Sequence, residues 1–370
     1  MIRVFKPSYD NLELEAVAEI LKSGWVGLGP KTAEFERAFA SFCNVDHCIG
    51  LNSGTAAISM ALRLLDIGAG DEVIIPTMTF VSGAHCVINR GATPVFVDID
   101  RDTLNLDLND VRNKISSRTR AIMPVHFGGR PVRMDELKAI AEDIPIIEDC
   151  AHAAGSKYRG QSVGSIGAIG CFSFHAVKNL AMGEGGAIVL NDGEMAKRAK
   201  KLRWLGINRE TWDRTNLDRS YWWEYSIDEI GVKSHMDDIH AAIGLVQLRK
   251  LEEANQRRRE ITLIYRNGLG SIEQLEMPLE ETDDFVSSWH IFEIKAQRRD
   301  ELNLFLDRNG ISTGVHYKPL HLYTCYGSQP ALPVAEDVFR SILTLPLYPD
   351  LTDEEVVYVI NTIRKFYNDR

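Results

Sequence analysis

Short apolar runs alternate with stretches of helical period between about residue 45 and residue 190 of the chain. The apolar runs read HCIGL, DEVIIP, TPVFVDI, RAIMPVHF and IPIIED, and the helical stretches between them include TAAISMALRLL, LDLNDVRNKI and MDELKAIAE. Strands that alternate with helices are typical of a mostly parallel sheet covered by helices. Such sheets bind ligands beyond the carboxyl ends of their strands. We therefore expect an α/β fold with its site in the loops that follow these strands.

The pattern changes after residue 190. A helical stretch, EMAKRAKKLRWL, leads into a polar and aromatic segment, and a long helical pattern begins near Met236 and ends at RNGL. The remaining chain, with SSWHIFEIKA, DELNLFLDRNG and STGVHYKPLHLY, predicts a smaller α+β domain. Since 370 residues are enough for two domains, we predict a large domain over residues 1–250, which includes an N-terminal arm, and a small domain over residues 251–370.

The charge balance and composition exclude several classes of protein. The chain has 42 Lys and Arg against 52 Asp and Glu, a formal net charge of −10, whereas nucleic-acid binding requires a basic face. The first twenty residues are interspersed with charges, and no run approaches the ~18 consecutive apolar residues of a membrane span. The six cysteines form no CxxC pair, which favours reduced thiols over disulfides or zinc. We expect a cytoplasmic protein that binds no nucleic acid, no membrane and no metal.

Four motifs carry the candidate chemistry, in the order LNSGTAAI (51–58), PTMTF (76–80), IIEDCAHAAG (146–155) and CFSFHAVKNLAMGEGGAIVL (171–190). Each one alone also has an ordinary structural explanation. The first is either a plain helix cap or an anion site made by free N–H groups at a helix start. The aromatic of the second is usually core, the carboxylates of the third often cap helices, and the lysine of the fourth is usually a surface charge. The four together, on one α/β scaffold, indicate a single site.

These motifs resemble the DegT/DnrJ/EryC1/StrS family of sugar aminotransferases, which are pyridoxal-phosphate enzymes of fold type I, the aspartate aminotransferase fold. The resemblance covers nearly the whole chain, since it continues in SGWVGLGPKTAEFE, GATPVFVDID, MDDIHAAIGLVQLRKLE, STGVHYKPLHL and LPLYPDLTDEE. It implies a large domain with a mostly parallel seven-stranded sheet, a smaller C-terminal α+β domain, and a homodimer whose subunits share their active sites.

The resemblance implies the cofactor contacts. Lys178 matches the lysine that forms a Schiff base with pyridoxal phosphate, a role that suits an amine whose surroundings can lower its pKa. Asp149 matches the carboxylate that pairs with the pyridine nitrogen, and an aspartate, with an ordinary pKa of about 3.9, stays ionised at neutral pH and keeps that nitrogen protonated. The remaining matches are His152 on the ring hydroxyl, Phe80 on the ring face, and Gly54, Thr55 and Ser173 on the phosphate.

One segment departs from the family pattern. Many members have an Asn that reaches the phosphate of the neighbouring subunit, and Lys233 stands at that position here. Either Lys233 binds the phosphate, since a cation suits a dianion, or it faces solvent. His235 has no assigned role.

The resemblance also implies the substrates. We expect transamination of a keto-deoxy nucleotide sugar, with a 4-keto-6-deoxy hexose as the first candidate and L-glutamate as the donor, giving an amino-sugar nucleotide and 2-oxoglutarate through pyridoxamine phosphate. The product would serve polysaccharide or natural-product synthesis, O-antigen included. The tryptophan-rich stretch 212–223 is predicted to be core, with a nucleotide or subunit contact as the alternative. Candidate substrate contacts are Gly27 at the end of the N-terminal arm, His316, Tyr317, Lys318 and His321.

Several alternatives remain open from the sequence. The amine could go to C3 instead of C4, and the carrier could be UDP, GDP or dTDP. A nucleotide-sugar 3-dehydratase of the same fold would have His in place of Lys178. A cysteine desulfurase using Cys325 and a regulatory protein that has lost activity are less consistent with the retained motifs. A nicotinamide-dependent dehydrogenase would need a GxGxxG after the first strands.

Overall fold

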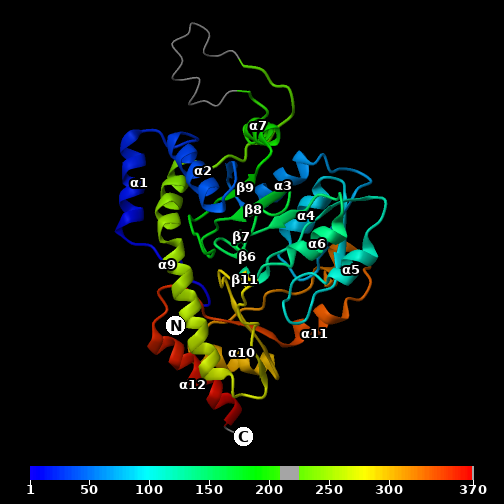
Figure 1. The fold of residues 1–370 in the computed structure, drawn as a ribbon. Helices are drawn as coiled ribbons and strands as arrows, with labels where there is room; N and C mark the ends of the chain where they lie inside the picture. The colour runs from blue at the N-terminus through cyan, green and yellow to red at the C-terminus, as the bar shows by residue number, and fades with distance from the viewer. Residues whose placement is uncertain (209–224, 369–370) are drawn as a thin grey trace.

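The structure is a computed structural model that describes residues 1–208 and 225–368. Its N-terminal part contains two sheets surrounded by helices (Figure 1). The first sheet has four strands, in the order β1 (His47–Leu51), β9 (Gly186–Leu190), β8 (Ile169–Ser173) and β5 (Ile147–Asp149). The second has three, in the order β3 (Thr93–Val97), β2 (Glu72–Pro76) and β4 (Thr119–Ile122). β9 is antiparallel to β1 and β8, whereas the pairs β5–β8, β2–β3 and β2–β4 are parallel.

The predicted single seven-stranded sheet is not found, because its strands are divided between the four-stranded and the three-stranded sheet. The two sheets meet between β4 and β5, where isolated parallel bridges, one of them between Val125 and Asp149, replace a ladder. The Asp149 N–H donates to the Pro124 carbonyl at 2.9 Å, but Pro124 has no N–H to return. Pro145, just before β5, lacks one as well. Prolines therefore interrupt the pairing that would join the two sheets.

Helices cover both faces of the first sheet, as the alternating pattern predicts. Along β9, Ile188 and Leu190 belong to a core shared with α3 (Gly54–Leu64), α4 (Ser82–Asn89) and α7 (Gly193–Leu202). Ala187 and Val189, on the opposite face, belong to a core shared with α2 (Pro30–Cys43) and α9 (Asp238–Leu269). This two-residue alternation follows from the strand period. The remaining helices of this part are α1 (Asn11–Ser23), α5 (Leu108–Lys114) and α6 (Met134–Ala141).

The C-terminal part has a core of its own. Its sheet has the order β10 (Leu275–Glu276), β12 (Phe292–Ala296) and β13 (Ile342–Leu345), and both pairs are antiparallel. α10 (Arg299–Arg308) and α12 (Asp353–Asn368) pack on this core, to which Ile2 also contributes. The other helices of the described residues are α11 (Pro333–Ser341) and three short 3-10 helices, Phe127–Gly129, Leu320–Leu322 and Thr324–Tyr326. A small fourth sheet has the order β11 (Phe285–Val286), β6 (Lys157–Tyr158) and β7 (Gln161–Ser162).

The long helix α9 connects the two parts (Figure 1). Leu245 and Leu251 lie in the N-terminal core, whereas Tyr265 and Leu269 lie in the C-terminal core. The boundary predicted at residue 250 thus falls inside an unbroken helix, and the division into residues 1–250 and 251–370 stays a prediction. Within residues 1–208 and 225–368, no helix has the length and apolarity that crossing a membrane requires.

Candidate active site

A cavity of about 400 Å³ lies where β5 and β8 end and α3 begins. Most of the cofactor residues and part of the substrate residues expected from the sequence line it. Residues that the sequence did not assign also line it, among them Thr79, Ser82, Val125, His175 and Glu184. Four of these five lie within or next to the quoted motifs, so proximity to a motif was the only sequence signal for them. The predicted residues that the cavity brings together are Gly54, Thr55, Phe80, Asp149, His152, Ser173, Lys178, His316 and Tyr317.

The start of α3 forms one wall of the cavity. The Ser53 hydroxyl accepts the N–H of Ala56 at 3.1 Å and caps the helix. A side chain at Gly54 would bring its Cβ to 2.7 Å from the Cβ of Ser173, so this position requires glycine. The first turn of a helix offers unsatisfied N–H groups and the positive end of the helix dipole. Gly54, Thr55 and Ser173 therefore form a wall suited to an anion.

Lys178 and Asp149 set the electrostatics of the cavity. Burial lowers the pKa of the Lys178 amine to about 8, although the negative charge of Asp149 acts in the opposite direction. Asp149, at the end of β5, is 7% exposed. Burial raises the pKa of its carboxyl, against the hydrogen bond from the Ala151 N–H and the charge of Lys178. An amine with a pKa near neutrality is a competent nucleophile and proton acceptor.

Hydrogen bonds define the protonation state of His152. Its Nδ1 accepts the N–H of Gly128 at 3.3 Å, so the ring proton is on Nε2, which donates to the Tyr317 hydroxyl oxygen at 3.0 Å. Burial, together with the charge of Lys178, places the pKa of His152 well below its ordinary value, and the ring is neutral. The Tyr317 hydroxyl is left with its own proton to donate, because burial raises its pKa.

Phe80 lies at the cavity and not in the core. Its side chain is 58% exposed, and its ring centroid is 6.3 Å from that of Tyr317. An exposed aromatic that lines a cavity offers a face for stacking a planar ligand.

Four of the predicted site residues do not line this cavity of their own chain. Lys233 is exposed, and its ammonium lies 5.6 Å from the centroid of the Trp204 ring. Lys318 is exposed and lies over Tyr323. Gly27 accepts the N–H of Asp238 through its carbonyl, and the predicted roles of these residues stay predictions.

The fourth of these residues, His321, is buried and has partners on both sides of its ring. Nδ1 lies 2.7 Å from the Thr77 hydroxyl, and Nε2 lies 3.2 Å from Glu336. The ring of His235, which had no assigned role, packs edge-on against Trp204 with a centroid distance of 4.6 Å. The tryptophan-rich stretch 212–223 lies outside the described residues.

Comparisons with known proteins show which family this chain belongs to. The model of the DegT/DnrJ/EryC1/StrS aminotransferase family matches residues 7–364. This chain belongs to that family. Spore coat polysaccharide biosynthesis protein SpsC of Bacillus subtilis is 38% identical over 372 residues, 97% of this chain and 95% of the relative. The dTDP-4-dehydro-2,3,6-trideoxy-D-glucose 4-aminotransferase of Saccharopolyspora spinosa is 37% identical over 374 residues, 99% of this chain and 96% of the relative.

Solved structures of family members have the same fold. The putative sugar aminotransferase Spr1654 of Streptococcus pneumoniae, in a structure described as its PMP form, matches with a TM-score of 0.94 and 34% identity over 100% of both chains. A second structure of the same protein is described as its PLP form. Aminotransferase TlmJ of Streptoalloteichus hindustanus matches with a TM-score of 0.93 and 36% identity over 98% of both chains. The family, the enzyme class and the cofactor predicted from the sequence are thus confirmed at the level of the family.

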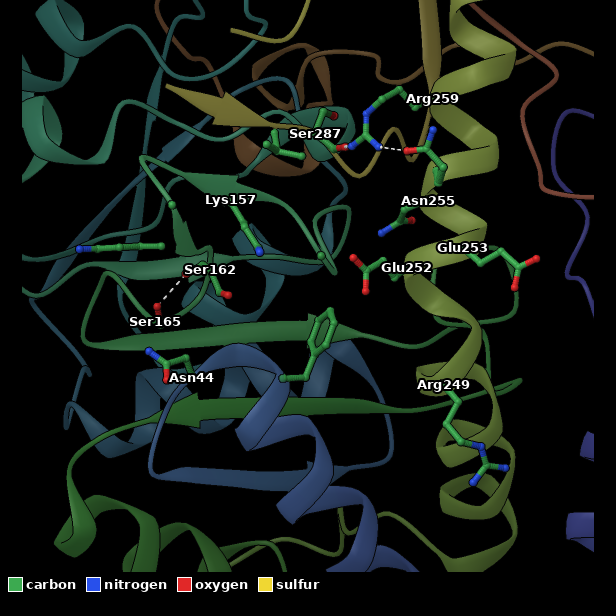
Figure 2. Close-up of a pocket in the computed structure, with 16 residues that line it drawn as sticks. Asn44, Lys157, Ser162, Ser165, Arg249, Glu252, Glu253, Asn255, Arg259 and Ser287 are labelled. Atoms are coloured by element: carbon green, nitrogen blue, oxygen red, sulfur yellow. Dashed lines mark hydrogen bonds between the residues drawn. The ribbon is translucent and has the colours of Figure 1, made fainter. Parts of the chain in front are cut away.

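A larger cavity, of about 1210 Å³, lies elsewhere in this aminotransferase chain. Figure 2 shows Glu252, Asn255 and Arg259 on α9 opposite Lys157 on β6. The Arg259 guanidinium is paired with Glu281 at 2.7 Å. None of the predicted site residues lines this groove, so cavity size alone would have located the site incorrectly.

One buried group has the composition of a metal site. His126, Glu148 and Cys150 offer ligand atoms close together, but hydrogen bonds occupy those of Glu148 and His126. Glu148 accepts the Nε2–H of His126 at 3.0 Å and three backbone N–H groups of the 164–167 turn. The other nitrogen of His126 accepts the N–H of Val132 at 3.1 Å. This network fixes the strand that carries Asp149, and it needs no ion.

Proposed function

We propose that this chain transfers the amino group of L-glutamate to a 4-keto-6-deoxy nucleotide sugar, with pyridoxal phosphate as its cofactor and pyridoxamine phosphate as the aminated form of that cofactor. The observation that carries the proposal is the single cavity that contains the amine of Lys178, the carboxylate of Asp149 and the start of α3. The S. spinosa relative, whose name states a 4-keto deoxy sugar nucleotide as its substrate, supports C4 over C3. A 3-keto sugar is the alternative acceptor.

The residues around the cavity fit pyridoxal phosphate. A Cβ at Gly54 would clash with Ser173, so the backbone stays bare at this helix start, which favours a phosphate dianion. Asp149 is an acceptor for a protonated ring nitrogen, Phe80 offers an exposed aromatic face, and Lys178 supplies the amine. These residues match the phosphate, the ring nitrogen, the ring face and the aldehyde of the cofactor.

Lys178 and Asp149 have different roles in the proposed reaction. When bound, pyridoxal phosphate supplies a carbonyl carbon that bonds to amines and a ring that accepts the electrons of a carbanion. Lys178, once displaced by the donor amine, is free to accept the α-proton of the donor at Nζ and to return a proton in the second half-reaction. Its lowered pKa of about 8 leaves part of the amine unprotonated near neutral pH, as a proton acceptor requires. Asp149 stabilises the protonated state of the ring nitrogen by its negative charge.

His152 and Tyr317 control the opposite edge of the site. The neutral His152 donates through Nε2, and the Tyr317 hydroxyl has a proton left to donate to a ligand oxygen. His316, which also lines the cavity, has its pKa lowered to about 4 by burial and the charge of Lys178. These rings orient ligands by hydrogen bonding without adding charge.

We further propose a homodimer in which Lys233 serves the phosphate of the neighbouring subunit. In its own chain this side chain is exposed and does not line the cavity. Three apolar side chains of α1, Leu12, Leu14 and Leu21, are also exposed in the single chain. A second subunit would cover them. Mixed dimers of Lys178→Ala and Lys233→Ala chains test the shared site, because each such dimer retains one intact site and regains activity that neither parent has. The absence of any recovery would contradict sharing through Lys233.

The experiment that tests the function combines the protein, pyridoxal phosphate, L-glutamate and dTDP-4-keto-6-deoxyglucose. We expect equimolar amino-sugar nucleotide and 2-oxoglutarate, detected by mass spectrometry. Nuclear magnetic resonance of the product then decides between C4 and C3. Loss of a hydroxyl without gain of an amine would favour the 3-dehydratase alternative, and Lys178 argues against this outcome.

A further inference from the structure

Arg258 is a buried guanidinium without a balancing carboxylate in the described part of the chain. It lies on α9 and is 3% exposed. Its Nη1 donates to the Leu347 carbonyl at 3.0 Å, but its Nε is buried without a partner in residues 1–208 and 225–368. Burial lowers the pKa of Arg258 to about 10, and no neighbouring charge opposes that shift. A buried charge without a counter-charge is costly to the fold, so its retention calls for another explanation.

Its neighbours along α9 show how unusual this is. Arg257 pairs with Asp353 at 2.7 Å, and Arg259 pairs with Glu281 at 2.7 Å. Each of these guanidinium groups is partly exposed and has a carboxylate beside it. Arg258, which is more buried than either, forms no ion pair with the described residues. The charge of Arg258 is thus not balanced by any carboxylate of residues 1–208 and 225–368.

Arg258 lines a small pocket of about 40 Å³ together with Lys178 and Asn179. Two further cations at this pocket are already neutralised. Lys250 pairs with Glu13 at 2.8 Å, and Lys6 pairs with Asp350 at 3.1 Å. The charge left for a ligand is that of Arg258, in a pocket that is also lined by Lys178, and Lys178 lines the cavity of about 400 Å³ as well.

The volume of this pocket and the unpaired Nε of Arg258 favour a carboxylate as the ligand. Because Nη1 is occupied, the unpaired edge of the guanidinium is the one that carries the buried Nε, and this edge can bind a carboxylate with two parallel hydrogen bonds. A volume of about 40 Å³ suits a carboxylate group better than a nucleotide diphosphate. The donor amino acid must place its amine where the Lys178 amine was. Its α-carboxylate is attached to the carbon that carries this amine, whereas its side-chain carboxylate is farther away.

We infer that Arg258 binds the α-carboxylate of the amino-acid donor in the pocket behind Lys178. This inference rests on the proposed function, since it assigns a donor subsite to the same lysine. It also explains the burial of Arg258, because the cation is paired whenever the donor is bound. Arg258 thereby selects amino acids over simple amines.

The test compares two donors on the pyridoxal-phosphate-loaded protein, L-glutamate and L-isoglutamine, whose α-carboxylate is an uncharged amide. Rapid-mixing absorption measurements give an apparent dissociation constant for each. We expect Arg258→Lys, which keeps a charge but loses the planar fork, to raise the constant for glutamate by about 10- to 100-fold. The constant for isoglutamine should change by less than about 3-fold, because an amide does not form the charged pair.

Arg257→Lys is the matched control, since it makes the same change one residue away in a surface ion pair, and both constants should remain at their wild-type values. Should Arg258→Lys not fold, Arg258→Gln retains an N–H for the Leu347 carbonyl without the charge. An independent readout is the dissociation constant of 2-oxoglutarate for the pyridoxamine form, which should rise by a similar factor. The affinity for the cofactor should not change.

Different outcomes would contradict the Arg258 inference and the proposed function. If wild-type protein responds to glutamate but Arg258→Lys raises both donor constants equally, or neither, this inference is wrong and the proposed function stands. L-glutamine has an uncharged amide in place of the side-chain carboxylate. If Arg258→Lys leaves the dissociation constant of L-glutamine unchanged but raises that of isoglutamine, Arg258 binds the side-chain carboxylate instead. If wild-type protein responds to no amino acid, both the inference and the proposed function fail.

Discussion

The imidazole of His152 and the phenol of Tyr317 are joined by a hydrogen bond of 3.0 Å between Nε2 and the hydroxyl oxygen, although 165 residues separate them. Their rings are also nearly parallel, with an interplanar angle of 18°. This pair connects the loop after β5 to the segment between α10 and β13. One rim of the cavity is thus held by a contact between the two parts of the chain.

We expect Tyr317→Phe to lower the free energy of unfolding by about 1 kcal/mol, because the buried Nε2–H of His152 loses its acceptor. Urea denaturation of the protein without cofactor measures the change. Tyr323→Phe is the control, since this hydroxyl forms no hydrogen bond among the described residues. An equal loss in both variants would show that the His152 contact contributes nothing specific.

Asp149→Asn should retain the cofactor but slow turnover by about 100- to 10,000-fold, because a neutral amide does not stabilise a protonated ring nitrogen. Steady-state kinetics and the absorption spectrum of the bound cofactor measure these two effects separately. Asp135→Asn, which alters an exposed carboxylate, is the control. Unchanged turnover in Asp149→Asn would mean that a different carboxylate serves the ring.

The rate of covalent loading with pyridoxal phosphate should follow the unprotonated fraction of Lys178. Burial lowers its pKa to about 8, so the free amine becomes dominant above pH 8 instead of above pH 10. We expect the loading rate to rise roughly tenfold per pH unit below this value and to level off above it. Absorbance after mixing protein and cofactor gives the rate at each pH. A rate that still rises steeply above pH 9 would contradict the lowered pKa.

Replacing Glu148 tests the buried network that fixes the strand of Asp149. Glu148→Gln should lower the free energy of unfolding by about 3 kcal/mol, because a buried carboxylate that accepts four hydrogen bonds becomes an amide with a single acceptor oxygen. Burial alone would raise the pKa of Glu148, but the His126 and backbone hydrogen bonds outweigh it and lower the pKa below 4.5. The stabilisation is therefore complete above pH 4.5 and is lost as pH falls through the lower folded-state value.

Denaturation of wild type and Glu148→Gln at several pH values measures this difference, with the exposed Glu136→Gln as the control. The difference should shrink in acid. Dialysis against a metal chelator should leave the stability of the wild-type protein unchanged, because hydrogen bonds already occupy Glu148 and His126. A clear loss of stability on chelation would show that the cluster of His126, Glu148 and Cys150 holds a metal.

The elements of the fold were predictable from the sequence because local periodicity determines them. The apolar runs became β1, β2, β3, β4 and β5, and the helical pattern from Met236 became α9. The division of the sheet was not predictable. Pro124 and Pro145 are visible in the sequence, but their effect depends on which strand each one faces, and that register is set by tertiary packing.

The site was partly predictable for a similar reason. Asp149 and Lys178 lie close to strand ends, and the sheet topology brings such positions together. Contacts between distant side chains left no local pattern. The His321 ring contacts Thr77 and Glu336, and the ring centroid of His290 lies 4.4 Å from that of His152. None of these contacts could be inferred without the fold.

The central claim, that Lys178 transfers an amino group from glutamate, is tested most directly by the visible absorption of the pyridoxal-phosphate-loaded protein titrated with L-glutamate alone. We expect the band of the lysine-bound cofactor to disappear with release of one equivalent of 2-oxoglutarate per chain, and to return when dTDP-4-keto-6-deoxyglucose is added. Lys178→Ala should show neither change. A loaded protein whose band does not respond to glutamate, or a Lys178→Ala variant that turns over like wild type, would contradict the account.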